Sequence, residues 1–272
     1  QAKAECVQMV LSGTASGVMG ASYIAESCGF DRLLSLDIGG TSADVAVIIN
    51  GRPEYGSGEI IGDFPIYIPS VSVTSVGQGG GSIAWIDSLG VLQVGPDSAG
   101  SLPGPVCFRR GGTEATATDA FAACGLIGHG DLGYNAVQVD VAGARAAVGK
   151  LAEPLGISIE ETAENIIALA ISSMYSDTSG LISRFGLDPR EFYFLAFGGA
   201  GPMMGCFLAR ELKLKGVVVP PTPGVLSALG GLVADIKNDF IRTLYCDLTA
   251  AVSDRLQQNA QQLRTEAEGW LA

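Results

Sequence analysis

The chain has 272 residues, of which 47% are hydrophobic and 16% charged, so it can bury a large core and is not intrinsically disordered. Its net charge is −12 and it has no run of five or more basic residues, which makes nucleic acid and anionic membrane surfaces poor partners. Six scattered cysteines without a Cys-x-x-Cys pair, and one histidine, argue against a structural zinc site and indicate a reducing, cytoplasmic setting.

The first predicted helix lies within residues 16–29, where small residues predominate and Gly29 ends the pattern. Small side chains on such a helix permit close packing on a sheet. Residues 33–50 follow the order apolar run, glycine turn, apolar run, which predicts a β-hairpin. A further strand is expected at 59–61, after the turn at 50–53.

Asp37 lies at the mouth of this hairpin, just before the adjacent glycines Gly39 and Gly40. Without Cβ atoms, the two glycines let backbone N–H groups curl around an anion such as phosphate. A functional Asp37 would then hold Mg²⁺ or orient a water molecule, because a carboxylate cannot bind an anion directly. The alternative is a plain hairpin in which the glycines supply positive φ and Asp37 caps the turn.

Residues 64–120 contain many glycines and predict short strands with little helix. A glycine cluster at 77–82 precedes strands expected at 83–86 and 91–94; it is either a loop against a ligand or an irregular connection. Arg109 and Arg110 adjoin another glycine turn and could grip a carboxylate or phosphate. They could equally pair with nearby acids in a solvated loop.

Residues 121–190 carry apolar side chains at helical spacing, and Ser158 with Glu161 forms a capping-box pattern that predicts the start of the long helix. His129 is expected in a surface loop, without partners for a metal. Next, a buried strand (192–197), a glycine turn (198–202), a helix and a strand at 217–219 predict a βαβ unit. Its turn lies at the carboxyl end of a strand, where open α/β sheets bind ligands. The chain ends in a polar helix.

These segments together resemble the hydantoinase A and 5-oxoprolinase family, which includes the ATP-binding subunits of acetone and acetophenone carboxylases. The resemblance spans about residues 12–243 and is carried by the hairpin and by VGQGGGSIAWID, VGPDSAGSLPGPVCFRRGGTEATATDA, DPREFYFLAFGGAGP and VVVPPTPGVLSALGGLVAD. It implies an actin-like, ribonuclease H-like ATPase lobe of α/β class over residues 1–247, with a mixed sheet flanked by helices and a glycine-rich β insertion at about 64–120. Residues 248–272 would begin a truncated helical region. The chain starts without methionine, and we expect it to lack the N-terminal lobe that carries the first phosphate hairpin.

The resemblance also implies ATP and Mg²⁺ as cofactors and assigns residues to three groups. The catalytic residues are Asp37, which is also the Mg²⁺ ligand, and Asp44. The nucleotide-binding residues are Gly39, Gly40, Thr41, Ser42, Gly198, Gly199, Ala200 and Gly201. The residues on the substrate side are Gly79, Gly80, Gly81, Ser82, Arg110 and Asp119.

The implied function is the ATP-binding half of a hydrolase that activates a cyclic amide, of hydantoin or 5-oxoproline type, by phosphorylating its oxygen. Alternatives are a subunit of a ketone carboxylase, a kinase of the same superfold, or a nucleotide-binding subunit without catalysis. A hydantoinase B-type subunit is the expected partner, in an oligomer. The chain departs from the family pattern by lacking an acid, two histidines and an arginine, at Ser72, Thr74, Met204 and Ser179.

Overall fold

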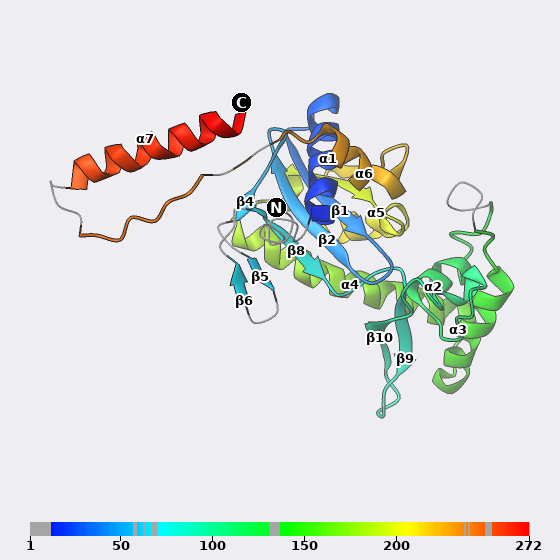
Figure 1. Ribbon diagram of the computed structural model, residues 1–272. Coiled ribbons are helices and arrows are strands. Elements are labelled where there is room, and N and C mark those ends of the chain that lie inside the picture. Colours follow the sequence, from blue (N-terminus) through cyan, green and yellow to red (C-terminus); the bar gives the residue numbers. More distant parts are fainter. Residues whose placement is uncertain are drawn as a thin grey trace. The chain divides into compact units, whose positions relative to one another are not determined.

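The computed structural model describes residues 12–56, 59–61, 64–66, 70–130, 137–236, 238, 240–247 and 252–271 (Figure 1). Its contacts divide the chain into two compact units, the first ending at Ala234 and the second beginning at Asp235. The first unit contains a central sheet with helices, and the second contains one long helix. Across the described ranges, no helix has both the length and the apolar character needed to cross a bilayer.

A central mixed sheet organises the first unit. Its members are β1 (Arg32–Ile38), β2 (Ala43–Ile49), β3 (Arg52–Pro53), β8 (Val73–Val76), β11 (Tyr193–Phe197) and β12 (Gly216–Val218). The strands follow the order β12-β11-β1-β2-β3, and β8 also pairs with β2. The predicted hairpin is confirmed as the antiparallel pair β1–β2, whereas β11 runs parallel to β1 and β12 runs parallel to β11.

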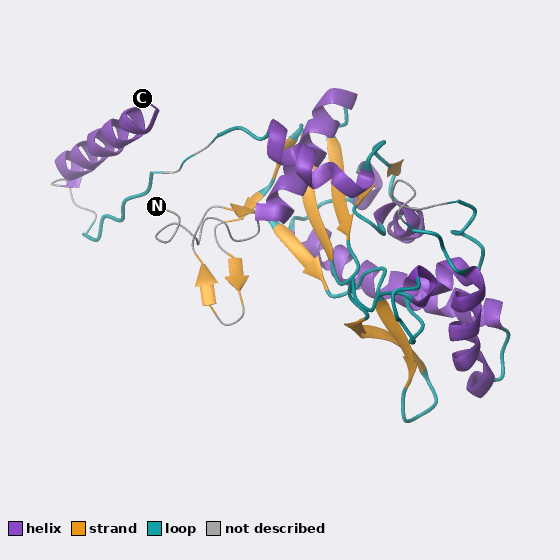
Figure 2. Ribbon diagram, turned by 45° about the vertical axis from the view of Figure 1, so that its right-hand side comes forward, coloured by secondary structure: helices purple, strands orange, loops and turns teal. Residues whose placement is uncertain are grey.

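Helices cover both faces of this sheet (Figure 2). They are α1 (Ser12–Cys28) and α6 (Leu226–Val233) on one face, and α4 (Ile159–Arg184) and α5 (Gly201–Leu212) on the other. Successive residues of a strand point to opposite faces, so Leu33 packs with α1 and α6 while Leu34 joins the core on the α4 and α5 side. Four consecutive residues of β1 are therefore buried.

The first helix packs as closely as its small residues predict, but its nearest neighbour is α6. A Cβ atom added to Gly20 would lie 2.7 Å from the carbonyl oxygen of Leu226, and one added to Gly230 would lie 2.6 Å from the nitrogen of Gly20. Only glycine allows the two helices this separation. The contact brings the start of α6 to the end of α1 that faces the hairpin mouth, where Ser227 and Thr14 lie.

The predicted βαβ unit is confirmed, because β11, α5 and β12 follow one another and both strands lie in the central sheet. The predicted start of α4 is also correct: the hydroxyl of Ser158 accepts the N–H of Glu161 at 3.1 Å. A 3₁₀ turn (Pro189–Glu191) leads into β11, and another (Pro223–Val225) leads into α6.

In the stretch 64–120 the two strands expected after the glycine cluster are present and form a hairpin, β9 (Ser82–Ile86) with β10 (Leu92–Ser98). The stretch differs from the prediction in two other ways. Strand β8 belongs to the central sheet, and the stretch also contains the 3₁₀ turn Val106–Phe108 and the start of α2 (Ala117–Ala123), which packs on α3 (Val141–Leu155) and α4. The high glycine content of the stretch obscured the helical elements. The place of β8 in the central sheet could not be predicted locally, because its partner β2 is distant in sequence. The remaining strands pair as β4 (Tyr55–Gly56) with β7 (Ser70–Val71), and β5 (Glu59–Ile61) with β6 (Phe64–Ile66).

The second unit contains the predicted polar helix, α7 (Val252–Leu271). Arg242 in the preceding segment donates to the Glu266 carboxylate at 2.7 Å, and the rings of Phe240 and Trp270 pack at a steep angle with centroids 6.3 Å apart. These contacts hold the preceding segment against α7.

Candidate functional site

Two carboxylates face each other at the mouth of the β1–β2 hairpin. Asp37 near the end of β1 is the direct cross-strand partner of Asp44 near the start of β2. The oxygens of Asp44 accept hydrogen bonds from Thr14 Oγ1 at 2.9 Å and from Ser75 Oγ at 2.5 Å. Asp37 accepts a longer bond of 3.3 Å from Ser227 Oγ on α6. Asp44 is thus held from two sides, while Asp37 keeps one oxygen without a side-chain partner among the described residues.

Burial raises the pKa of Asp37 above its ordinary value of 3.8, the hydrogen bond from Ser227 opposes the shift, and the charge of Asp44 adds to it. Desolvation and a neighbouring like charge both disfavour the ionised form of a carboxyl group. A proton or a cation placed at Asp37 relieves both effects. The pair is therefore suited to bind a hard divalent cation through oxygen ligands, the coordination that Mg²⁺ prefers.

The turn between the carboxylates has the form of an anion cradle. The N–H of Gly39 donates to the carbonyl of Ser42 at 2.9 Å and closes the turn. Gly40 and Thr41 at its tip are exposed, and within the described part of the chain their N–H groups meet no acceptor. Consecutive free N–H groups at a turn attract anions such as phosphate oxygens. The phosphate-binding role of these residues stays a prediction, with which this geometry agrees.

The second predicted turn is joined to the first. Gly198 follows β11, the parallel neighbour of β1, so both turns lie at the carboxyl end of the sheet. The N–H of Ala200 donates to the carbonyl of Ile38 at 2.9 Å. Gly198 has a φ of +80°, and a Cβ atom there would lie 2.6 Å from that same carbonyl oxygen and collide with the Asp37 carboxylate. Gly199 remains exposed, with open space beside it. Gly201 is buried at the start of α5.

The glycines predicted on the substrate side pack directly under the hairpin turn. Gly80 donates its N–H to the Gly39 carbonyl at 3.0 Å, and Gly81 donates to the Gly40 carbonyl at 2.7 Å. A Cβ atom at Gly79 would lie 2.8 Å from the Gly40 oxygen. The Ser82 hydroxyl accepts the N–H of Gly79 at 3.0 Å. These residues are buried, and the loop braces the anion cradle with its main chain. Their place on the substrate side stays a prediction.

Asp119, predicted on the substrate side, lies in the interior of the protein. Its side chain is 0% exposed, and its oxygens accept the N–H groups of Cys107 at 2.8 Å and Val106 at 3.2 Å, together with the N–H and hydroxyl of Thr116. It caps α2 and ties that helix to the 3₁₀ turn. These bonds give Asp119 a structural role, and its place on the substrate side stays a prediction.

The paired arginines separate in the structure. Arg109 Nε donates to the Asp140 carboxylate at 3.0 Å, the pairing with a nearby acid that we considered as the alternative, and this arginine holds the pKa of Asp140 below its usual range. Arg110 is exposed and forms no ion pair with any described residue. It stays a prediction as a substrate-side residue.

The departures from the family pattern lie in different surroundings. Met204 is 0% exposed and belongs to the hydrophobic core. The hydroxyl of Thr74 accepts a hydrogen bond from Arg184 of α4 at 2.7 Å. Ser72 and Ser179 are half-buried. Apolar packing therefore explains Met204.

Three hydroxyl groups of the site were missed by the sequence analysis: those of Thr14, Ser75 and Ser227. Ser227 lies in the PPTPGVLSALGG motif, which contributes to the family resemblance but does not single out this serine as a site residue. Thr14 and Ser75 offer no local signal, since each lies about thirty residues from Asp44 in the chain. Among the described residues no cluster of three or more His, Cys, Asp or Glu side chains could hold a metal, and His129 is exposed as predicted. Mg²⁺ would thus need water or phosphate oxygens beside Asp37 and Asp44.

Comparison with known proteins places this geometry in a family. The family model described as hydantoinase/oxoprolinase matches residues 1–240. The caprolactamase alpha subunit of Pseudomonas jessenii is 39% identical over 261 residues, which cover 95% of this chain and 38% of that subunit. The chain therefore spans well under half the length of this relative.

Solved structures agree with the sequence comparison. The ATP-dependent caprolactamase from Pseudomonas jessenii superposes with a TM-score of 0.78 at 37% identity, covering 93% of this chain and 37% of that one. Nucleotide-free acetone carboxylase gives a TM-score of 0.74 at 33% identity, covering 82% of this chain and 32% of that one. The predicted α/β fold of actin-like ATPase type is confirmed by these neighbours. With its sheet, its paired turns and this match over most of its length, the chain belongs to the hydantoinase/oxoprolinase family.

Proposed function

We propose that the chain is the ATP-binding lobe of an enzyme that uses ATP to open a cyclic amide. The observation that carries the proposal is the Asp37–Asp44 pair beside the unoccupied N–H groups of Gly40 and Thr41. Phosphoryl transfer requires groups that position phosphate oxygens and a cation that spreads their charge. The N–H groups of the turn would position the phosphate oxygens, and the two carboxylates would hold Mg²⁺ as the cation. Similarity to an ATP-dependent caprolactamase supports the choice of substrate class.

The chemistry can be written so that atoms balance. The amide oxygen attacks the γ-phosphorus of ATP, and ADP leaves. Water then adds to the activated carbon and the ring amine departs, which leaves an acyl phosphate. A second water attacks the carbonyl carbon and releases inorganic phosphate, so that the products are an amino acid, ADP and phosphate. Phosphorylation is useful here because it converts a poor leaving oxygen into a good one.

The residues of this chain would act on the phosphates. Gly40 and Thr41 would donate their N–H groups to phosphate oxygens, while Ser42 and the buried 79–81 loop keep the turn closed. Mg²⁺ at Asp37 would neutralise charge on the transferring group. Asp44, fixed by Thr14 and Ser75, would position that cation or its water. The exposed Gly199 turn leaves room for the nucleoside beside Asp37. The substrate's own pocket and a hydantoinase B-type partner subunit belong to the proposal for the full-length protein.

A ketone carboxylase subunit is the second candidate, supported by the match to acetone carboxylase. Both reactions phosphorylate a carbonyl-derived oxygen, so the nucleotide half would be the same. A kinase would instead release a stable phosphorylated product, and a non-catalytic subunit would bind ATP without stimulated hydrolysis.

ATP hydrolysis by the full-length protein, with a partner subunit if one is found, distinguishes these candidates. Caprolactam, hydantoin, 5-oxoproline and acetone are each tested as stimulators. Asp37→Asn should abolish the stimulated rate, whereas Asp177→Asn should retain it, because Asp177 is exposed on α4 and forms no hydrogen bond with the described residues. Stimulation by no cyclic amide, or an active Asp37→Asn enzyme, would overturn the proposal.

A further inference from the structure

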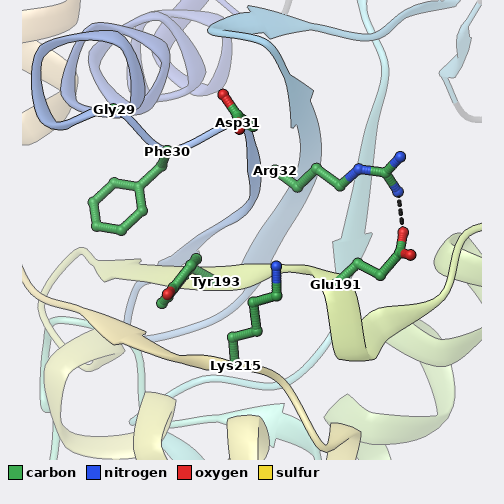
Figure 3. Close-up of a pocket in the computed structure, with 7 residues that line it drawn as sticks. All are labelled: Gly29, Phe30, Asp31, Arg32, Glu191, Tyr193 and Lys215. Atoms are coloured by element: carbon green, nitrogen blue, oxygen red, sulfur yellow. Dashed lines mark hydrogen bonds and ion pairs between the residues drawn. The ribbon is translucent and has the colours of Figure 1, made fainter.

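A pocket of about 360 Å³ (Figure 3) is lined by residues at one end of the central sheet, and the two glycine turns lie at the other end. It is formed where β1, β11 and β12 begin, whereas Asp37 and Gly198 mark where β1 and β11 end. Its lining consists of Gly29, Phe30, Asp31, Arg32, Glu191, Tyr193 and Lys215. The volume is at the small end of the range for ligand pockets, which suits a metabolite of few atoms.

The charged side chains of this pocket differ in what they are free to bind. Arg32 and Glu191 form an ion pair with each other along one wall (Figure 3). Lys215 forms no ion pair with any residue that the structure describes, and its ammonium group points into the middle of the pocket (Figure 3). Asp31 lies on the side of the pocket away from Lys215 (Figure 3), likewise without an ion-pair partner in the described ranges. The pocket thus presents one available cation and one available anion.

An apolar wall joins these two charges. The rings of Phe30 and Tyr193 lie with centroids 4.9 Å apart and tilted by 55°. The ammonium of Lys215 is 5.8 Å from the centre of the Tyr193 ring, a cation–π distance that holds the side chain across the pocket. The two rings can make apolar contacts with the hydrocarbon part of a ligand whose charged groups lie near Lys215 and Asp31.

We infer that this pocket binds a short zwitterionic amino acid, its carboxylate at Lys215, its ammonium toward Asp31 and its methylene chain against Phe30 and Tyr193. A simple anion would leave Asp31 unpaired, and a simple amine would leave Lys215 unpaired. A polyphosphate would meet two carboxylates. Opening a cyclic amide yields a product of the matching class, so the pocket would sense that product from the far end of the sheet; this last step rests on the proposed function.

Calorimetric titration of the full-length protein tests the inference, with 6-aminohexanoate as the probe and hexanoate and hexylamine as analogues that each lack one charge. The probe should bind about tenfold more tightly than either analogue, since each charged hydrogen bond contributes substantially. Lys215→Met keeps the apolar stem but should weaken probe binding about tenfold. Lys213→Met is the matched control: it removes a charge two residues away, from an exposed side chain outside the pocket, and should leave binding unchanged.

Asp31→Asn should remove the preference for 6-aminohexanoate over hexanoate. Equal affinity of the parent and the Lys215→Met variant for the probe would overturn the inference, because it would locate binding elsewhere, for instance at a catalytic centre. If no cyclic amide stimulates ATP hydrolysis by the parent protein but probe binding depends on Lys215, the proposed function is overturned. The inferred ligand class of the pocket is then retained.

Discussion

Asp37 and Asp44 are direct cross-strand partners, yet their environments differ. Thr14 and Ser75 donate to both oxygens of Asp44, while Asp37 receives one long bond from Ser227 and is partly desolvated. Asp44 is therefore held in a fixed orientation by its two donors. A cation or proton is stabilised more at Asp37, whose negative charge is poorly compensated.

The raised pKa of Asp37 predicts a stability effect. The folded protein binds this proton more tightly than the unfolded chain, so stability contributed by the protonated form is lost as pH rises from the ordinary value of 3.8 through the raised pKa. At neutral pH without nucleotide, Asp37→Asn should therefore raise the melting temperature, and the difference should vanish in acid. Melting curves from pH 4 to 8 test this, with Asp177→Asn as control. A parent more stable than Asp37→Asn at pH 7 would contradict it.

Ser227→Ala should shift the pH profile of ATP hydrolysis. The serine hydroxyl lowers the pKa of Asp37, so its removal should raise that pKa and move the acidic limb of the profile to higher pH. A lost hydrogen bond of this kind is worth about 0.5–1.5 kcal/mol. Ser88→Ala, at the exposed tip of the β9–β10 hairpin, should leave the profile in place. An unchanged acidic limb in Ser227→Ala would mean that the hydroxyl does not act through Asp37.

Gly79→Ala tests the brace beneath the anion cradle. The new Cβ atom would lie 2.8 Å from the main chain of Gly39 and Gly40, which cannot move without opening the turn. Overpacking of this kind costs about 1–3 kcal/mol in unfolding free energy, and we expect the KM for ATP to rise as well. Gly77→Ala in the same loop meets nothing within 4 Å and provides the control. Equal effects of both variants would refute the bracing role.

Asp119→Asn should destabilise the fold without a specific effect on substrate binding. Its oxygens accept hydrogen bonds from backbone N–H groups of Val106, Cys107 and Thr116, and an amide NH₂ in place of one oxygen would face these donors. Leaving buried donors unpaired costs about 1–3 kcal/mol per group. Chemical denaturation measures the loss. A variant of parental stability with a raised KM for the amide would instead support the predicted substrate-side role of Asp119.

The parts of the fold that rest on local periodicity could be predicted from the sequence. The β1–β2 hairpin, the βαβ unit and the start of α4 at Ser158 each have a signal within a few neighbouring residues. Their joining into one sheet could be expected only through the family resemblance, because β1 and β11 are far apart in the chain.

The candidate site was predictable only in part, for a physical reason. The glycine turns can be recognised in the sequence, because few other residues allow such close main-chain approach. The hydroxyl groups around the carboxylates do not: Ser227 reaches Asp37 across 190 residues. The structural role of Asp119 could not be predicted, because the sequence does not show that the N–H groups of Cys107 and Val106 fold back onto it from 12 and 13 residues away.

The central claim, phosphorylation of the amide oxygen by ATP held at this lobe, is tested most directly by an isotope. Caprolactam, or whichever cyclic amide stimulates hydrolysis, is labelled with ¹⁸O in its carbonyl and turned over by the full-length protein with ATP. Mass spectrometry of the released inorganic phosphate should find one ¹⁸O atom in it, transferred from the amide. Label retained wholly in the amino acid carboxylate would contradict the account, because the proposed sequence breaks the bond between the carbonyl carbon and the labelled oxygen.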